Sequence, residues 1–116
     1  MHSIKKTKSF KIVYGSGRQA VNPYFVMYVR HNDSNISRLG ITVSKKVGKA
    51  VIRNRVRRLV KESCRLRAAK VTKGMDIVIV ARPAVANLER EVAFIKVDKS
   101  LEQLFRKLQL LCSEVD

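Results

Sequence analysis

The chain has 116 residues, which suits a single domain, and 46% of them are apolar, enough for a packed core. Lysine and arginine number 25 against 9 acidic residues, so the formal net charge is +16. A compact domain with that charge repels itself, so the composition predicts a polyanionic partner. Wholesale disorder is excluded, and so is a membrane span, because apolar runs such as residues 77–81 are too short. The basic residues 1–11 lack the apolar stretch of a secretory signal.

The first half of the chain predicts one short helix and two strands. Residues 9–14 place apolar side chains at helical spacing, and Gly15 and Gly17 follow as helix stops. Residues 24–30 are rich in aromatic and β-branched side chains, as strands prefer, and residues 38–44 form the next strand. The short polar turn between these strands predicts an antiparallel hairpin.

The second half predicts two long helices around a buried strand. Residues 49–68 are the clearest helix, with an apolar stripe made by Ile52, Val56, Leu59, Val60, Ser63 and Leu66. Residues 75–81 form an almost wholly apolar run, typical of a central strand, and residues 90–111 carry a second helical stripe. The order helix, strand, strand, helix, strand, helix predicts a mixed α/β domain, a small sheet with helices packed on it.

The positive charge is concentrated in residues 41–73, which hold twelve basic residues and one acidic residue, Glu62. In the predicted helix, Arg53, Arg57 and Lys61 stack like charges four residues apart, which costs helix stability. We therefore expect this face to bind nucleic acid, so that residues 1–116 form one RNA-binding domain. A merely solvated basic helix and an anionic membrane surface are the alternatives. The second is weakened because the chain has no tryptophan and its apolar stripe is needed for the core.

A second candidate surface is aromatic. Phe10 and Tyr14 are four residues apart and share one helical face, while Tyr28 occupies one side of the strand at residues 24–30. If the hydroxyls of Thr42 and Ser44 line the same side, the result is a cleft of rings and hydroxyls beside Lys45 and Lys46. Such clefts bind single-stranded nucleic acid by base stacking. The alternative is that the two rings only dock the first helix on the sheet.

Motifs of catalysis and metal binding are absent from the sequence. The chain lacks a phosphate-binding glycine loop, a nucleophile elbow and a zinc-protease helix, and its carboxylates are too sparse for a two-metal nuclease. Cys64 and Cys112 lie 48 positions apart without a Cys/His cluster, so we expect reduced thiols in a cytoplasmic protein. Any reactive groups are expected to come from another molecule.

Residues 39–59, LGITVSKKVGKAVIRNRVRRL, resemble the signature of the bacterial ribonuclease P protein subunit. The family pattern is V-S-K-K-x-G-x-A-V-x-R-N-R-x-[KR]-R, and the chain matches it throughout. The pair Phe10 and Tyr14 fits the aromatic pair of the family's first helix, although phenylalanine is commoner at the second position. The segments FVMY, IVARP and SLEQLFRK also fit, so the likeness covers residues 4–110.

The resemblance implies an α/β (α+β) sandwich of three helices on a mixed four-stranded sheet, with an unusual left-handed βαβ crossover. It also implies a subunit that joins a large catalytic RNA, binds the 5′ leader of precursor tRNA and assists the Mg²⁺-dependent removal of that leader. The RNA would hold most of the Mg²⁺, and the isolated protein would require none. The protein is expected to be monomeric, in a 1:1 complex with the RNA, and to have no membrane partner.

The resemblance also assigns residues to the two partners, and none of them is expected to be catalytic. The catalytic RNA would contact Arg53, Asn54, Arg55, Arg57 and Arg58, with Lys46 and Lys61 as additions. The leader would contact Phe10, Tyr14, Tyr28, Thr42, Ser44, Lys45 and Arg53. The alternative function is a non-catalytic RNA-binding module, such as a ribosome-associated protein, which the charge would suit equally well.

Overall fold

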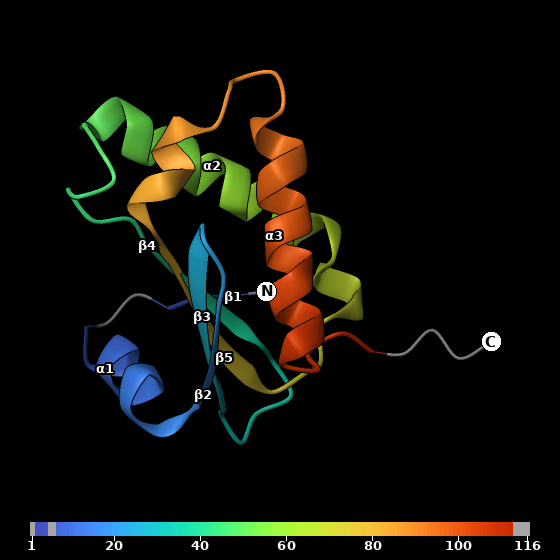
Figure 1. Cartoon of the computed structure of the whole chain (residues 1–116). Coiled ribbons are helices and arrows are strands. Elements are labelled where there is room, and N and C mark those ends of the chain that lie inside the picture. The colour runs from blue at the N-terminus through green and yellow to red at the C-terminus, as the bar shows by residue number, and fades with distance from the viewer. Residues whose placement is uncertain (1, 5–6, 113–116) are drawn as a thin grey trace.

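A mixed β-sheet separates one short helix from two longer helices (Figure 1). The computed structural model describes residues 2–4 and 7–112. In chain order, the elements are β1 (His2–Ser3), α1 (Thr7–Ser16), β2 (Arg18–Val21), β3 (Phe25–His31), β4 (Arg38–Thr42), α2 (Ala50–Leu66), β5 (Met75–Ala81) and α3 (Ala93–Lys107), with 3₁₀ turns at Ala68–Lys70 and Pro83–Asn87. The three helices and the α/β class are those expected, with α1 longer than predicted and α2 and α3 shorter.

The sheet has the order β1-β4-β5-β3-β2 in the part of the chain that the structure describes. β5 lies in the centre, antiparallel to β3 and parallel to β4. The predicted hairpin between residues 24–30 and 38–44 is therefore wrong, because β5 lies between these two strands. Both faces of β5 are apolar and must be shielded from water. The centre of the sheet, with packed elements above and below it, provides that shielding.

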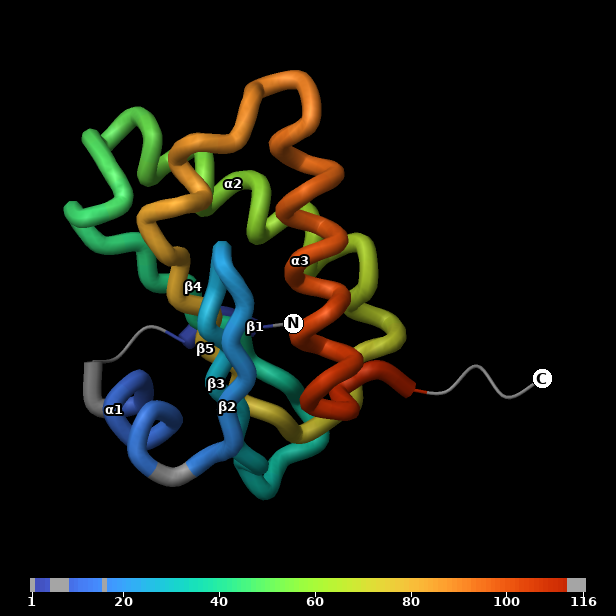
Figure 2. The backbone as a smooth tube through the Cα atoms, viewed as in Figure 1, coloured from blue at the N-terminus to red at the C-terminus, as the bar shows by residue number. Residues whose placement is uncertain are grey.

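The hairpin of this sheet is instead formed by β2 and β3, which run side by side in Figure 2. The side-chain oxygen of Asn22 closes its turn by accepting hydrogen bonds from the backbone N–H groups of Tyr24 and Phe25, at 3.0 and 2.9 Å. With the two-residue β1 at the other edge, the sheet has five strands rather than four. β4 and β5 are adjacent and parallel and are joined through α2, which makes the βαβ crossover whose left-handed sense the resemblance implies.

Side chains from the two faces of the sheet form two separate hydrophobic clusters. The larger cluster joins β3, β4 and β5 to α2 and α3, and Phe25, Met27, Ile79, Leu101 and Phe105 are fully buried within it. The smaller cluster consists of Ile4, Val13 and Val78, with Phe10, Tyr28 and Val80 packed against it under α1. The alternation predicted for residues 24–30 is confirmed, since β3 sends side chains to both clusters.

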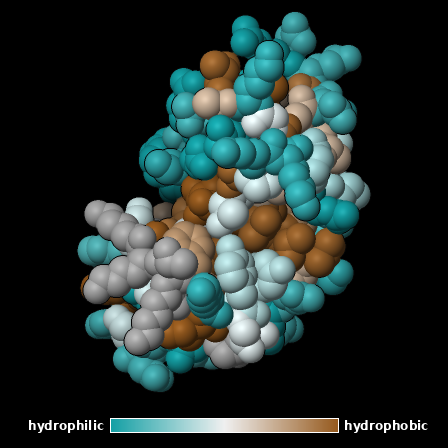
Figure 3. Space-filling view, turned by 90° about the vertical axis from the view of Figure 1, so that its left-hand side faces the viewer, coloured by the Kyte–Doolittle hydropathy of each residue, from teal (hydrophilic) through white to brown (hydrophobic). Residues whose placement is uncertain are grey.

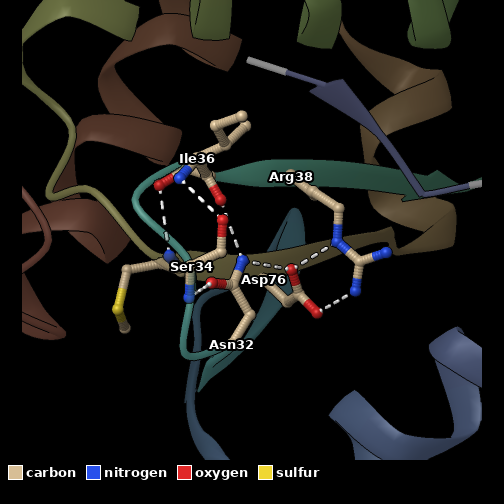
Figure 4. Close-up of polar contacts among 7 residues, drawn as sticks. Asn32, Ser34, Ile36, Arg38 and Asp76 are labelled. Atoms are coloured by element: carbon tan, nitrogen blue, oxygen red, sulfur yellow. Dashed lines mark hydrogen bonds and ion pairs between the residues drawn. The ribbon is translucent and has the colours of Figure 1, made fainter.

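A buried carboxylate connects the central strand to its neighbours (Figure 4). Asp76 on β5 is 1% exposed and accepts hydrogen bonds from Arg38 Nε on β4, at 2.8 Å, and from Asn32 Nδ2, at 2.9 Å. Asn32 Nδ2 also donates to the backbone oxygen of Ile36, so the same side chain shapes the loop between β3 and β4. These hydrogen bonds fix the loop between β3 and β4 against the start of β5.

The same network sets the protonation of Asp76. Burial on its own raises the pKa of this carboxyl group, but hydrogen bonds from Arg38 and Asn32 and the charges of Arg38 and Arg30 outweigh burial. The net effect lowers the pKa of Asp76 below its ordinary value. A lowered pKa in the folded state stabilises the fold above the unfolded-state pKa, and that stabilisation is lost as the pH falls through the folded-state value.

Replacing Asp76 with asparagine should therefore destabilise the protein in a pH-dependent way. We expect a loss of about 2 kcal/mol at neutral pH, because Arg38 keeps a charge without its partner. The difference from the parent protein should shrink below about pH 4, where aspartate in the unfolded chain takes up its proton. Urea unfolding at a series of pH values measures both effects, and Asp33→Asn on the exposed loop is the matched control. A difference that is the same at all pH values would contradict this account.

Candidate nucleic-acid interface

The rings that the sequence places on one helical face meet the sheet beside β4. The ring centroids of Phe10 and Tyr14 are 6.4 Å apart, and those of Tyr14 and Tyr28 are 4.9 Å apart with their planes at 75°. The hydroxyl oxygens of Tyr14 and Thr42 lie 3.1 Å apart and share a hydrogen bond. Four of the predicted leader residues are thus one contiguous group, which we call the aromatic cluster: Phe10, Tyr14, Tyr28 and Thr42.

Gly40 on β4 explains how α1 comes so close to the sheet. A Cβ atom at this position would lie 2.7 Å from ring carbons of Phe10, too close for van der Waals contact. The absence of a side chain therefore leaves the space that the ring occupies. The sequence interpretation missed Gly40, although an isolated glycine inside a predicted strand is a known signal of a close approach.

The aromatic cluster serves two purposes. Phe10 and Tyr28 are partly buried against the small cluster under α1, so the rings do dock this helix, as the alternative held. Tyr14, however, is 39% exposed and lies at the outer side of the group. A ring held by edge contact and a hydrogen bond, with part of its surface open, is available for stacking.

Ser44 and the two lysines lie just beyond the end of β4. The N–H group of Val47 donates to the backbone oxygen of Ser44 at 3.0 Å, so residues 44–47 form a turn. Lys45 and Lys46 occupy its two corners, and both side chains are exposed. The structure thus places Ser44 with this turn, which we call the lysine turn, while Thr42 joins the aromatic cluster.

The remaining predicted residues are on α2, within residues 53–61. Asn54, Arg58 and Lys61 are exposed, whereas Arg53, Arg55 and Arg57 are half-buried. Two of the half-buried guanidinium groups bind the backbone: Arg53 Nε donates to the oxygen of Gly48 at 3.2 Å, and Arg57 Nη2 to that of Val43 at 3.4 Å. The Nε atom of Arg55 is buried without a hydrogen-bond partner among the described residues.

The predicted apolar stripe of α2 is confirmed except at its end. Val56, Val60 and Ser63 are buried, but Leu66 is 58% exposed. Arg67, the next residue along the chain, is buried in place of Leu66. Its guanidinium lies 2.9 Å from a carboxylate oxygen of Asp98 and packs over the Phe105 ring, 5.8 Å from the centroid. An acidic partner on α3, which sequence periodicity does not reveal, makes this burial possible.

A recess of about 520 Å³ connects the two predicted surfaces. Its apolar lining includes Ile4, Phe10 and Ile41, and its basic lining consists of Arg57, Lys61 and Arg65 from α2. Figure 3 views the side of the molecule where α1 and the start of α2 lie, and hydrophobic surface gathers in its middle between hydrophilic side chains. Phe10 belongs to both the aromatic cluster and the recess, so rings and guanidinium groups border one continuous surface.

The described residues contain neither a cluster of metal ligands nor a membrane-spanning helix. Within residues 2–4 and 7–112, no three His, Cys, Asp or Glu side chains gather in a group that could hold a metal ion. Over the same residues, no helix has the length and apolar character that crossing a membrane requires. The carboxylates of Asp76 and Asp98 are paired with Arg38 and Arg67.

Comparison with known proteins gives consistent matches along the chain. The family model described as Ribonuclease P matches residues 1–109. The ribonuclease P protein component of Clostridioides difficile is 44% identical over 108 residues, which cover 92% of this chain and 91% of that protein. The corresponding protein of Alkaliphilus metalliredigens is 39% identical over 110 residues, covering 95% of this chain and 96% of that one.

Solved structures agree with the sequence matches. The RNase P protein of Staphylococcus aureus superposes with a TM-score of 0.86 at 29% identity, covering 96% of this chain and 98% of that one. The RNase P protein of Thermotoga maritima gives a TM-score of 0.78 at 32% identity, with coverage of 91% and 97%. The matches span the rings of α1, the lysine turn and the basic helix together. The chain therefore belongs to the family of ribonuclease P protein components.

Proposed function

We propose that this subunit of ribonuclease P holds the 5′ leader of precursor tRNA at its aromatic cluster while the basic face of α2 binds the catalytic RNA. The observation that carries the proposal is the recess that joins Phe10 to Arg57 and Lys61. One continuous surface can hold a single strand against rings and, at its other end, phosphates of a folded RNA. A general RNA-binding module, such as a ribosome-associated protein, has no need for that combination.

The two parts of the surface suit different features of RNA. Stacking on a ring is tolerant of sequence, since every base has a flat face, and it fits an unpaired leader. Guanidinium groups bind phosphates at fixed positions, and α2 carries several of them on one rigid element.

The chemistry of cleavage is assigned to the RNA partner. We propose that the catalytic RNA holds most of the Mg²⁺ that activates water, because no three His, Cys, Asp or Glu side chains of the described residues gather in a group that could hold a metal ion. The protein contributes positive charge that reduces repulsion between phosphates, and it positions the leader. One protein would bind one RNA, in the cytoplasm. There both thiols stay reduced, and burial raises the pKa of Cys64 to about 12, which keeps its thiol protonated and unreactive.

Addition of the protein to the catalytic RNA should lower the Mg²⁺ concentration needed to remove the leader. The physical reason is that bound lysine and arginine replace part of the cation atmosphere of the two RNAs. Initial cleavage rates across a Mg²⁺ titration, with and without the protein, measure the shift. An identical Mg²⁺ midpoint in both series would show that the protein does not act in this way.

Replacing Arg55 and Arg58 with alanine should weaken binding to the catalytic RNA and flatten its salt dependence. Each lost phosphate contact should reduce the slope of log affinity against log salt by about 0.7 to 0.9. Binding isotherms at several salt concentrations give the slope. Lys99→Ala, on exposed α3 surface away from both proposed contact regions, is the control for a general loss of charge. If the double variant keeps the parent slope, α2 does not contact phosphates through these residues.

Replacing Tyr14 with alanine should selectively weaken binding of precursor tRNA to the assembled enzyme. Loss of one stacked base predicts a cost of about 1 to 3 kcal/mol for the precursor and almost none for mature tRNA, which has no leader. Tyr14→Phe is the matched control, because it keeps the ring and loses only the hydrogen bond to Thr42. Equal losses for the two RNAs would contradict binding of the leader at the aromatic cluster.

A further inference from the structure

The lysine turn is held from inside the molecule as well as by its own hydrogen bond. Val47, which closes the turn, is 5% exposed and is part of the larger hydrophobic cluster. Its N–H group is bonded to the oxygen of Ser44, so the backbone on both sides of Lys45 and Lys46 is fixed. The two ammonium groups therefore extend from a preorganised support rather than from a loose loop.

Two arginines of α2 bind the backbone at the two ends of this turn. Arg57 Nη2 donates to the oxygen of Val43, the residue before the turn, and Arg53 Nε donates to the oxygen of Gly48, the residue after it. The two side chains are four residues apart and so lie on one face of the helix. Arg57 Nη1 also donates to Asn54 Oδ1 at 3.2 Å, which orients its guanidinium plane.

These contacts connect the helix that bears the RNA-binding arginines to the loop that bears the lysines. We propose that Arg53 and Arg57 are positioning residues: by holding the carbonyls of Gly48 and Val43, they fix where Lys45 and Lys46 meet RNA phosphates. The inference rests on the proposed function together with the family resemblance, which assigns Lys45 to the leader and Lys46 to the catalytic RNA. It adds that two residues assigned to phosphate contact also act through the lysine turn.

Lysine in place of arginine separates charge from positioning at residue 53. Lysine keeps the positive charge, but it has a methylene group where arginine has Nε, so Arg53→Lys removes the donor to Gly48. Arg57→Lys likewise removes the planar group that bonds Val43 and Asn54 together. Arg58→Lys is the matched control, since Arg58 is an exposed arginine of the same helix.

The first measurement uses the free protein and follows hydrogen exchange of the Val47 amide. If the two arginines hold the turn, this amide should exchange about fivefold faster in Arg53→Lys and in Arg57→Lys, but not in Arg58→Lys. An unchanged midpoint of thermal unfolding establishes that each variant is folded. Unaltered exchange in both variants would overturn the inference, because a role confined to phosphate contact leaves the free protein unaffected.

The second measurement uses the assembled enzyme and combines Arg53→Lys with Lys45→Ala or Lys46→Ala. Positioning predicts coupling: each lysine substitution should weaken its own RNA contact about fivefold less in the Arg53→Lys background than in the parent. The affinities for precursor tRNA and for catalytic RNA report on Lys45 and Lys46 respectively. The salt slope of Arg53→Lys itself should fall below that of the parent, because the displaced lysines lose phosphate contacts although the protein keeps its charge.

The outcomes separate this inference from the proposed function. If the lysine substitutions weaken binding but combine additively with Arg53→Lys, the positioning role is overturned while the RNA contacts stand. If the lysine substitutions leave both affinities unchanged, the contacts proposed for the turn are wrong and the positioning role is overturned with them. Faster Val47 exchange together with coupling supports both.

Discussion

The fold depends on the need to cover β5 on both of its faces. This strand is apolar on both sides and lies in the middle of the sheet, so water must be excluded from each face. α2 and α3 cover one face with a large cluster, whereas among the described residues the other face is covered by the short helix α1 and by Ile4. Because α1 is too small to seal the sheet completely, rings at its margin stay partly open. The aromatic cluster is therefore partly exposed because α1 covers this face of the sheet incompletely.

The proximity of the rings to the basic helix follows from the chain path. β4 carries Thr42 beside Tyr14, and only the lysine turn separates this strand from the start of α2. Thr42 of the aromatic cluster and the basic residues of α2 therefore come from consecutive segments. A short connection of this kind leaves little freedom between the two surfaces, which suits the simultaneous contact with two RNAs that we propose.

Local patterns predicted the local structure well. The almost wholly apolar run at residues 75–81 has the same bounds as β5, and the alternation on β3 placed Tyr28 on the face opposite Met27. The motif on α2 identified the basic face, and helical spacing paired Phe10 with Tyr14. These features depend on neighbours along the chain, and periodicity records such neighbours directly.

Pairings between distant segments were beyond the sequence patterns. The separation of β3 from β4 has no local signal, because it depends on which segment occupies the centre of the sheet. The burial of Arg67 has none either, because it depends on Asp98, which the facing helix α3 supplies. β1 and β2 are too short and polar for a periodic signal. The backbone contacts of Arg53 and Arg57 have no local signal either, because the charge pattern does not distinguish an arginine that binds the backbone from one that binds phosphate.

The position of α1 on the sheet is sensitive to the size of the side chain at residue 40. Phe10 packs closely on β4 because Gly40 has a hydrogen atom in place of a side chain. The same helix, α1, also carries Tyr14. A methyl group there would push Phe10 and its end of α1 away from β4 and so shift Tyr14 relative to Thr42. The placement of Phe10 and Tyr14 at the proposed leader surface therefore depends on the size of residue 40.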